Sequence, residues 1–249
     1  GDLHRLRPSA ILDPPRVLEM LREHFQLREE ALICNGMSVL DARHKVFADC
    51  RELAGGAEWL TTGGAKPGDN LMQWLGDVFG PRAVRNSYGA SEVGSISDDG
   101  RLLPGVEVKL EQWGNYSPSD LPCPRGELCV RTDELITGYI GVEHEALDSD
   151  GFFHTGDIVE MRPPPTLEGI PFDPCRAWAY DLKVVDRKTN LIKLAHGEWV
   201  SPQDLEALFT SACPSLDQIC IHCLPGATGV AAIVVPASRC QKEFNDEQK

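Results

Sequence analysis

The pattern of apolar residues changes at Val84, and no other feature of this sequence constrains its fold as strongly. Before Val84, apolar residues recur at helical spacing, which predicts helices over residues 13–30 and 37–53 and a third that begins at Asp69. After it, short apolar runs between turn residues indicate strands at residues 106–110, 127–131, 158–161, 183–186 and 191–194. The sequence therefore predicts an α/β protein, mixed α+β in arrangement, with a β-rich later part.

The remaining segments add detail to this prediction. They are a strand at residues 58–62, a surface loop over the proline-rich residues 162–177, strands at residues 218–224 and 230–235, and a polar tail from residue 237. Ser201 followed by Pro202 is typical of a helix start and predicts a helix that ends near Ser211. Asp13 and Asp69 are expected to cap the first and third helices.

Charge and length exclude some classes of partner. The 249 residues suit one large domain, or one and a part. The net charge of −14 argues against nucleic acid as a partner, because an acidic surface repels phosphate backbones. No apolar run approaches the roughly 20 residues that a membrane-spanning helix needs, so no span is expected.

The cysteines indicate the redox environment. There are nine, an odd number at irregular spacing, which favours reduced thiols and a cytoplasmic protein. Cys220 and Cys223 form a C-x-x-C within an apolar run that is expected to be a strand. Residues three apart on a strand point to opposite faces, so we interpret this pair as structural rather than as a metal or redox pair.

Five short clusters that combine glycine, hydroxyl and charged residues carry the functional signal. In chain order they are Thr62–Ala65, Asn86–Glu92, Arg125–Leu128, His154–Asp157, and Asp186–Lys188 with Lys193 close behind. Any one of them alone is typical of a turn, because glycine occurs in loops of every kind. All five together favour a ligand site, because Gly63, Gly64, Gly89 and Gly156 let the backbone approach a ligand or adopt positive φ.

The residue types in these clusters suit a nucleotide. Such a site needs a flat aromatic ring for the base, a carboxylate for the ribose, a hydroxyl and a cation for phosphate, and a carboxylate for Mg²⁺. In that order, the clusters supply Tyr88, Asp157, Ser91, Arg187 and Glu92.

The order of the clusters resembles that of the adenylate-forming, or AMP-binding, enzymes over nearly the whole chain. Pro124–Leu128 and Lys193–Glu198 are most similar to the adenylation domain of carboxylic acid reductases, and long-chain acyl-CoA synthetases share the second segment closely. The resemblance implies that residues 1–186 are the later part of the large AMP-binding domain, with a β-rich subdomain. It implies that residues 187–249 begin the small mobile α+β domain, and that residues 186–190 are the hinge.

The resemblance also implies a role for each candidate residue. Tyr88, with Gly89 beside it, would stack on adenine, while Gly63, Gly64 and Ala65 would line the adenine and acyl pockets. Ser91 would face the α-phosphate and Glu92 would hold Mg²⁺. Asp157 and Arg187 would bind the ribose hydroxyls, and Lys193 would serve the step that involves the thiol.

Two parts of the family pattern are missing from this sequence. No Ser/Thr/Gly-rich phosphate loop precedes Gly63, and neither Lys242 nor Lys249 lies in the pattern that surrounds the family's late catalytic lysine. We therefore expect a partial domain that is inactive alone, with a natural pseudoenzyme as the alternative.

The expected function is ATP-dependent activation of a carboxylic acid, in particular a fatty acid, as an acyl-adenylate. The acyl group would then pass to a thiol, either CoA or phosphopantetheine. Two alternatives stay open at this point: the loading domain of a carboxylic acid reductase, with a carrier domain as partner, and a non-catalytic nucleotide-binding module. The sequence does not indicate the chain length of the acid.

Overall fold

The computed structural model describes residues 2–140, 147–213, 215–222, 224, 226 and 228–236. They form two compact units. The α/β unit comprises residues 1–89 and 97–100, and the β-rich unit comprises residues 90–96 and 101–249. Residues after Arg187 belong to the β-rich unit, so the domain boundary expected at 186/187 stays a prediction.

The α/β unit combines parallel strands with helices. Its strands are β1 (Ala10–Asp13), β2 (Trp59–Gly63) and β3 (Val84–Ala90), and its helices are α1 (Asp2–Leu6), α2 (Pro15–Cys34), α3 (Val39–Leu53) and α4 (Asp69–Phe79). β2 lies between β1 and β3 and pairs with both in parallel, with Leu60 opposite Val84. The three predicted helices are confirmed as elements. β1, which contributes only Ile11 to the core, was not predicted.

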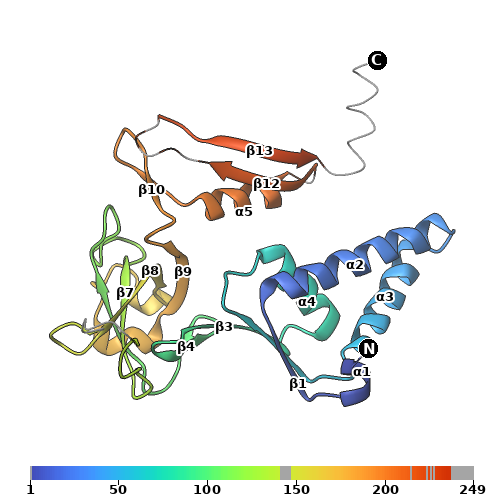
Figure 1. Ribbon diagram of the computed structural model, residues 1–249, viewed down its shortest axis with the longest axis horizontal. Coiled ribbons are helices and arrows are strands. Elements are labelled where there is room, and N and C mark those ends of the chain that lie inside the picture. The colour runs from blue at the N-terminus through green and yellow to red at the C-terminus, as the bar shows by residue number, and fades with distance from the viewer. Residues whose placement is uncertain are drawn as a thin grey trace. The chain divides into compact units, whose positions relative to one another are not determined.

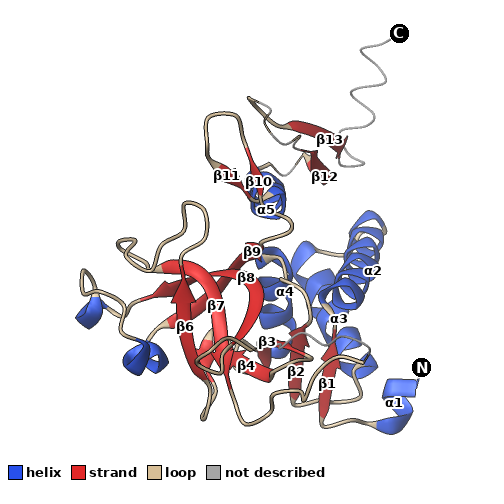
Figure 2. Ribbon diagram, turned by 60° about the vertical axis from the view of Figure 1, so that its left-hand side comes forward, coloured by secondary structure: helices blue, strands red, loops and turns tan. Residues whose placement is uncertain are grey.

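Apolar side chains attach the helices to this sheet. Leu18 of α2 and Leu75 of α4 pack in one buried cluster with Leu60 of β2 and Val84 of β3, so α2 and α4 cover the sheet (Figure 2). A second buried cluster joins α3 to its neighbours and consists of Phe25, Val46, Cys50 and Val78. This packing buries the helical stripes that the sequence pattern predicted.

Both predicted aspartate caps in this unit are wrong. Asp13 is the last residue of β1, and α2 starts after Pro14, whose extended backbone (φ −66°, ψ 153°) makes it the N-cap. Gly68 is the N-cap of α4, so Asp69 lies in the first turn, where its charge still favours the helix dipole. The remaining long helix of this unit, α3, does have a side-chain cap, because Ser38 Oγ accepts a hydrogen bond from the Asp41 backbone N–H at 3.1 Å.

The β-rich unit is built on an antiparallel sheet (Figure 1). Its strands are β5 (Arg101–Leu102), β6 (Glu107–Glu111), β7 (Arg125–Arg131), β8 (Phe153–Arg162) and β9 (Asp181–Arg187), in the spatial order β5-β9-β8-β7-β6, and β4 (Gly94–Asp98) contributes its first residues. β8 is longer than the predicted 158–161. The reason is that His154 still pairs with Cys129 and Asp157 still pairs with Arg187.

Smaller elements follow the sheet. They are the 3-10 helices η1 (Pro165–Leu167) and η2 (Pro174–Ala179) in the proline-rich loop, and then β10 (Ile192–Lys193), β11 (Trp199–Val200), α5 (Pro202–Ala212), β12 (Leu216–His222) and β13 (Ala231–Pro236). Ser201 caps α5 as predicted, since its Oγ accepts from the Asp204 backbone N–H at 3.1 Å. Cys220 is exposed in β12, while Cys223 and the polar tail from residue 237 lie outside the described residues. No helix among the described residues is long and apolar enough to cross a membrane.

Candidate functional site

The first group of candidate residues lies at the carboxyl ends of two parallel strands in the α/β unit. Gly63 ends β2 and is paired with Ser87 of β3, so Tyr88 follows directly on the neighbouring strand. Gly64 and Ala65 are exposed in the loop after β2, and Tyr88 is half-buried. Ligands of open α/β sheets bind outside the carboxyl ends of the strands, so these residues are placed where such a site is expected.

Gly63 and Gly64 have different structural reasons to be glycine. A Cβ on Gly63 would lie 2.6 Å from the backbone oxygen of Ser87, so the close pairing of β2 and β3 requires glycine there. Gly64 has φ +79° and nothing within 4 Å of its Cβ position, so it is needed for its backbone conformation. Of these two glycines, only Gly64 has open space at its Cβ position.

The second group lies in the turn between β3 and β4. Ser91 is exposed, and Glu92 is half-buried in the same turn, which a hydrogen bond from the Val93 N–H to the Ala90 oxygen closes at 3.2 Å. Tyr139 donates a hydrogen bond from its hydroxyl to Glu92 Oε1 at 2.8 Å, and this bond raises the pKa of the Tyr139 phenol. Sequence reasoning missed Tyr139, which lies 47 residues away and contributes no motif of its own.

The third group is a carboxylate and a guanidinium on neighbouring strands. Asp157 of β8 faces Arg187 of β9 in register, and Arg187 Nε lies 3.3 Å from Asp157 Oδ1. The Asp157 side chain is 7% exposed, whereas that of Arg187 is 70% exposed. Gly156 has φ +72°, and its oxygen accepts a hydrogen bond from the Lys188 backbone N–H at 2.8 Å. The pair is thus held by backbone on both strands, and its cationic member is open to solvent.

The segment after β9, predicted to be a hinge, is fixed by a buried carboxylate. Asp186 is 4% exposed and accepts hydrogen bonds from Ser201 Oγ at 2.5 Å and from Asn190 Nδ2 at 3.0 Å. Lys188 Nζ donates to Glu127 Oε2 on β7 at 2.7 Å. Segment 186–190 is therefore tied to the sheet on one side and to the start of α5 on the other.

Lys193 lies in a different environment from the other candidates. Its side chain is exposed on β10, and its Nζ is 5.8 Å from the centre of the Trp199 ring on β11. Its backbone oxygen accepts a hydrogen bond from the Gly226 N–H at 3.1 Å. The structure thus groups Gly63–Ala65 with Tyr88, and Asp157 with Arg187. How these groups and Lys193 meet one ligand stays a prediction.

A concave pocket of about 480 Å³ lies elsewhere in the α/β unit. Its lining residues are Arg43, His44, Phe47, Arg51 and Asp77. None of the candidate residues lines it. This pocket is therefore separate from the strand ends and paired side chains of the candidate site.

Comparison with known proteins gives relatives of two kinds. The carboxylic acid reductase of Mycobacterium marinum is 31% identical over 244 residues, which cover 94% of this chain and 19% of that protein. The peroxisomal long chain acyl-CoA synthetase 7 of Arabidopsis thaliana is 35% identical over 216 residues, which cover 80% of this chain and 28% of that protein. The chain thus spans less than a third of the length of either relative.

A solved structure and a family model agree with these relatives. The adenylation domain of the carboxylic acid reductase from Segniliparus rugosus, in complex with AMP and a co-purified carboxylic acid, matches with a TM-score of 0.73 and 28% identity. The match covers 96% of this chain and 36% of that one. It confirms the predicted mixed α/β fold class. The model of the family described as AMP-binding enzyme matches residues 1–140, and the chain belongs to that family.

Proposed function

We propose that this chain is part of an enzyme that activates a carboxylic acid with ATP and passes the acyl group to a thiol. A carboxylate is a poor acyl donor because its leaving group is poor. Attack of the carboxylate on the α-phosphate of ATP forms an acyl-adenylate and releases pyrophosphate. AMP is then a good leaving group when the thiol of CoA or phosphopantetheine attacks the carbonyl carbon.

The observation that carries this proposal is the Asp157–Arg187 pair on β8 and β9. Asp157 is nearly buried, so its carboxylate is fixed in position before a ligand arrives, and Arg187 offers donors to solvent beside it. A fixed carboxylate and a guanidinium can bind the two ribose hydroxyls of a nucleotide through charge-assisted hydrogen bonds. Tyr88 would supply the stacking surface for adenine, with Gly89, Gly63, Gly64 and Ala65 around it.

Glu92 is the residue proposed to hold Mg²⁺. Its carboxylate offers oxygen donors of the kind that Mg²⁺ prefers, and the Tyr139 hydroxyl keeps one of them in place at 2.8 Å. When bound, the ion would offset negative charge on the phosphates. Ser91, exposed in the same turn, would donate its hydroxyl to the α-phosphate.

The thiol step is proposed to involve movement after residue 186. The small domain would begin at residue 187, with segment 186–190 as the hinge and Lys193 acting in the thiol step. The bonds of Asp186 to Ser201 and of Lys188 to Glu127 belong to one position of that hinge. A second position would require at least the Lys188–Glu127 pair to separate.

The ribose assignment is tested with Asp157→Asn in the full-length protein. Hydrogen bonds to a charged group contribute about 1.5–3 kcal/mol each, so adenylate formation should fall about tenfold or more. Pyrophosphate exchange measures this rate. Asp181→Asn is the matched control, because Asp181 is an exposed carboxylate at the far end of the same strand pair. Equal rates for Asp157→Asn and the unchanged protein would contradict the proposal.

The second candidate function is the loading domain of a carboxylic acid reductase. The likeness to the adenylation domain from Segniliparus rugosus favours it, with a carrier domain as partner. Supplying the full-length protein with either free CoA or a phosphopantetheinylated carrier distinguishes the two acceptors. Acyl transfer to CoA supports a synthetase, and transfer only to the carrier supports a loading domain.

The third candidate is a non-catalytic nucleotide-binding module. We propose that the 249 residues alone form no acyl-adenylate, because they contain no Ser/Thr/Gly-rich phosphate loop. They should bind AMP at about millimolar Kd, since stacking and ribose contacts contribute only a few kcal/mol. Calorimetry and a pyrophosphate-release assay test both statements.

The seven cysteines that the structure describes are free thiols, which is consistent with the proposed cytoplasmic location.

A further inference from the structure

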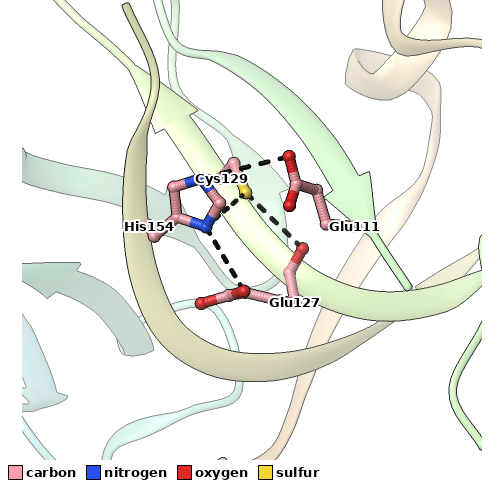
Figure 3. Close-up of side chains that lie close together, drawn as sticks. All are labelled: Glu111, Glu127, Cys129 and His154. Atoms are coloured by element: carbon pink, nitrogen blue, oxygen red, sulfur yellow. Dashed lines mark hydrogen bonds and ion pairs between the residues drawn. The ribbon is translucent and has the colours of Figure 1, made fainter. Parts of the chain in front are cut away.

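Four potential metal ligands meet on one face of the β-rich sheet, outside the proposed nucleotide site (Figure 3). They are Glu111 at the end of β6, Glu127 and Cys129 on β7, and His154 on β8. Glu127 and Cys129 are two residues apart on a strand, so their side chains share a face. Glu111 pairs with Glu127 and His154 pairs with Cys129 across the strands, so strand register brings all four together.

The separations of the donor atoms suit one small cation. One donor atom from each of the four residues lies within 4.8 Å of the other three. His154 Nδ1 is 3.5 Å from Cys129 Sγ and 3.3 Å from Glu127 Oε2. Ligands placed about 2.0–2.3 Å from a tetrahedral ion are about 3.3–3.8 Å apart, so Cys129, Glu127 and His154 Nδ1 already have suitable spacing. Glu111 Oε1 lies 4.0 Å from the other ring nitrogen, His154 Nε2, so the Glu111 side chain must turn toward the Nδ1 side to complete the set.

Neighbouring groups orient two of the four ligands. His154 Nε2, the ring nitrogen that faces away from Cys129, lies 3.5 Å from Asp148 Oδ2. Metal-binding histidines usually place their second nitrogen against a carboxylate in this way. Glu127 Oε2, the oxygen nearest His154 Nδ1, accepts from Lys188 Nζ at 2.7 Å and keeps a second lone pair for an ion.

We propose that Glu111, Glu127, Cys129 and His154 form a binding site for a Zn²⁺ ion that crosslinks strands β6, β7 and β8. A thiolate, an imidazole and carboxylates at tetrahedral spacing are the donors that Zn²⁺ takes, whereas Mg²⁺ and Ca²⁺ require oxygen donors throughout. Cys129 and Glu127 are buried, so these two ligands would shield the ion from solvent. On binding, Cys129 Sγ forms a bond to the ion and releases its proton to solvent.

A metal-free account of the cluster also exists and makes different predictions. His154 could simply bridge the carboxylates as a hydrogen-bonding group, with Lys109 and Lys188 balancing their charge. Burial raises the pKa of the Cys129 thiol to about 12, so without an ion Cys129 is an inert thiol. Metal binding that depends on this thiol separates the two accounts.

The test is a titration of the reduced, chelator-treated chain with Zn²⁺ and with Co²⁺ as a spectroscopic probe. The site should bind one Zn²⁺ per chain, and Co²⁺ should give the near-ultraviolet charge-transfer absorption of a thiolate ligand and the visible bands of a tetrahedral ion. Cys129→Ser should abolish the charge-transfer absorption. His154→Gln should weaken Zn²⁺ binding about a hundredfold, at the upper end of what even outer-shell changes cost.

The control variants address the other thiols. Cys34→Ser and Cys220→Ser change exposed cysteines on α2 and β12 and should leave both the stoichiometry and the absorption unchanged. Loss of the absorption in Cys220→Ser, with survival in Cys129→Ser, would place the ion at the C-x-x-C instead and overturn the proposal.

Further measurements distinguish the loss of metal binding from misfolding and from loss of activity. Cys129 is fully buried and its variant could misfold, so Glu111→Gln, which changes a half-exposed side chain, serves as the second ligand variant. Zn²⁺ should raise the Tm of the unchanged chain, and by clearly less in Glu111→Gln and His154→Gln. A folded, reduced chain that binds no Zn²⁺ at micromolar concentration would overturn the proposal. None of these measurements depends on adenylate formation, so the nucleotide proposal stands or fails separately.

Discussion

The α/β unit and the β-rich unit bury different kinds of side chain. In the α/β unit the buried polar residues that the structure describes are Thr62 and Ser97, both uncharged. In the β-rich unit they include the carboxylates of Glu127, Asp157 and Asp186. A buried carboxylate is costly unless it is paired, and each of these three has a donor or cation beside it.

This difference separates two ways of building a site. The α/β unit positions Gly63 and Tyr88 on strands that pair in parallel and that helices cover with apolar packing. The β-rich unit positions Asp157 through side-chain and backbone partners on adjacent strands. Substitutions of the buried apolar side chains in the first unit should therefore act mainly on stability, and substitutions of buried acids in the second should act on stability and function together.

The largest expected effect is that of Leu75→Ala in α4. Leu75 is fully buried among Leu18, Leu60 and Val84, so truncation should lower the free energy of unfolding by about 3–5 kcal/mol. Urea unfolding followed by circular dichroism measures this change. Leu40→Ala on α3, where the leucine is 69% exposed, should change it by less than about 0.5 kcal/mol. Similar losses from both variants would show that apolar packing does not dominate this unit.

The second prediction concerns Asp186→Ala in the β-rich unit. The change leaves the Ser201 hydroxyl and the Asn190 amide without their acceptor, and should cost about 2–3 kcal/mol. It should also increase proteolytic cleavage in segment 186–190. Lys183→Ala, at an exposed position of the same strand, is the control and should leave both measurements nearly unchanged. If Asp186→Ala and Lys183→Ala have the same free energy of unfolding and the same cleavage, the Asp186 carboxylate does not hold this segment in place.

The sequence predicted elements well where the periodicity was long and local. Helices α2 to α5 were expected because their apolar stripes and the Ser201-Pro202 start are encoded within one segment. β1 was missed because four residues with one buried side chain carry no usable period. The caps at Asp13 and Asp69 failed because Pro14 and Gly68 take the capping backbone positions.

The candidate site divides in the same way. Glycine-containing clusters were visible in the sequence, but the partners that fix them come from distant strands. The bond from Tyr139 to Glu92 and the register that sets His154 beside Cys129 join residues 47 and 25 positions apart. Register depends on how whole strands pair, so a single sequence does not reveal it.

The third prediction compares matched glycines in the two units. A Cβ on Gly63 would lie 2.6 Å from Ser87 O, and a Cβ on Gly126 would lie 2.5 Å from Glu111 O. Gly63→Ala and Gly126→Ala should each cost about 1–3 kcal/mol, because the neighbouring strand must shift. Gly229→Ala, with open space at its Cβ, should be neutral or slightly stabilising. Thermal unfolding of the three variants tests this, and a tolerated Gly126→Ala would mean that β6 and β7 can separate.

The smallest effect expected is a pH dependence in the β-rich unit. The Lys109 ammonium, together with the backbone N–H groups of Phe152 and Asp150, lowers the pKa of the Asp148 carboxyl. The stability that the ionised Asp148 carboxylate adds to the folded chain is therefore complete above its unfolded pKa of about 4 and is lost as pH falls below that value. The Tm difference between the unchanged chain and Asp148→Asn, measured with chelator present, should be constant above about pH 5 and shrink below pH 4. A difference that persists unchanged to pH 2 would contradict this assignment.

The contact between Trp113 and Trp199 has a practical consequence. Their ring centres are 4.3 Å apart, and a Cβ on Gly114 would lie 2.5 Å from Trp199 Nε1, so the β10–β11 hairpin is closely seated on the loop after β6. Two indoles this close couple their strongest electronic transitions and should give a paired positive and negative band in the far-ultraviolet circular dichroism spectrum. The chain thus contains its own optical reporter: if the hairpin leaves the sheet during a reaction cycle, that band should disappear without any label having been attached.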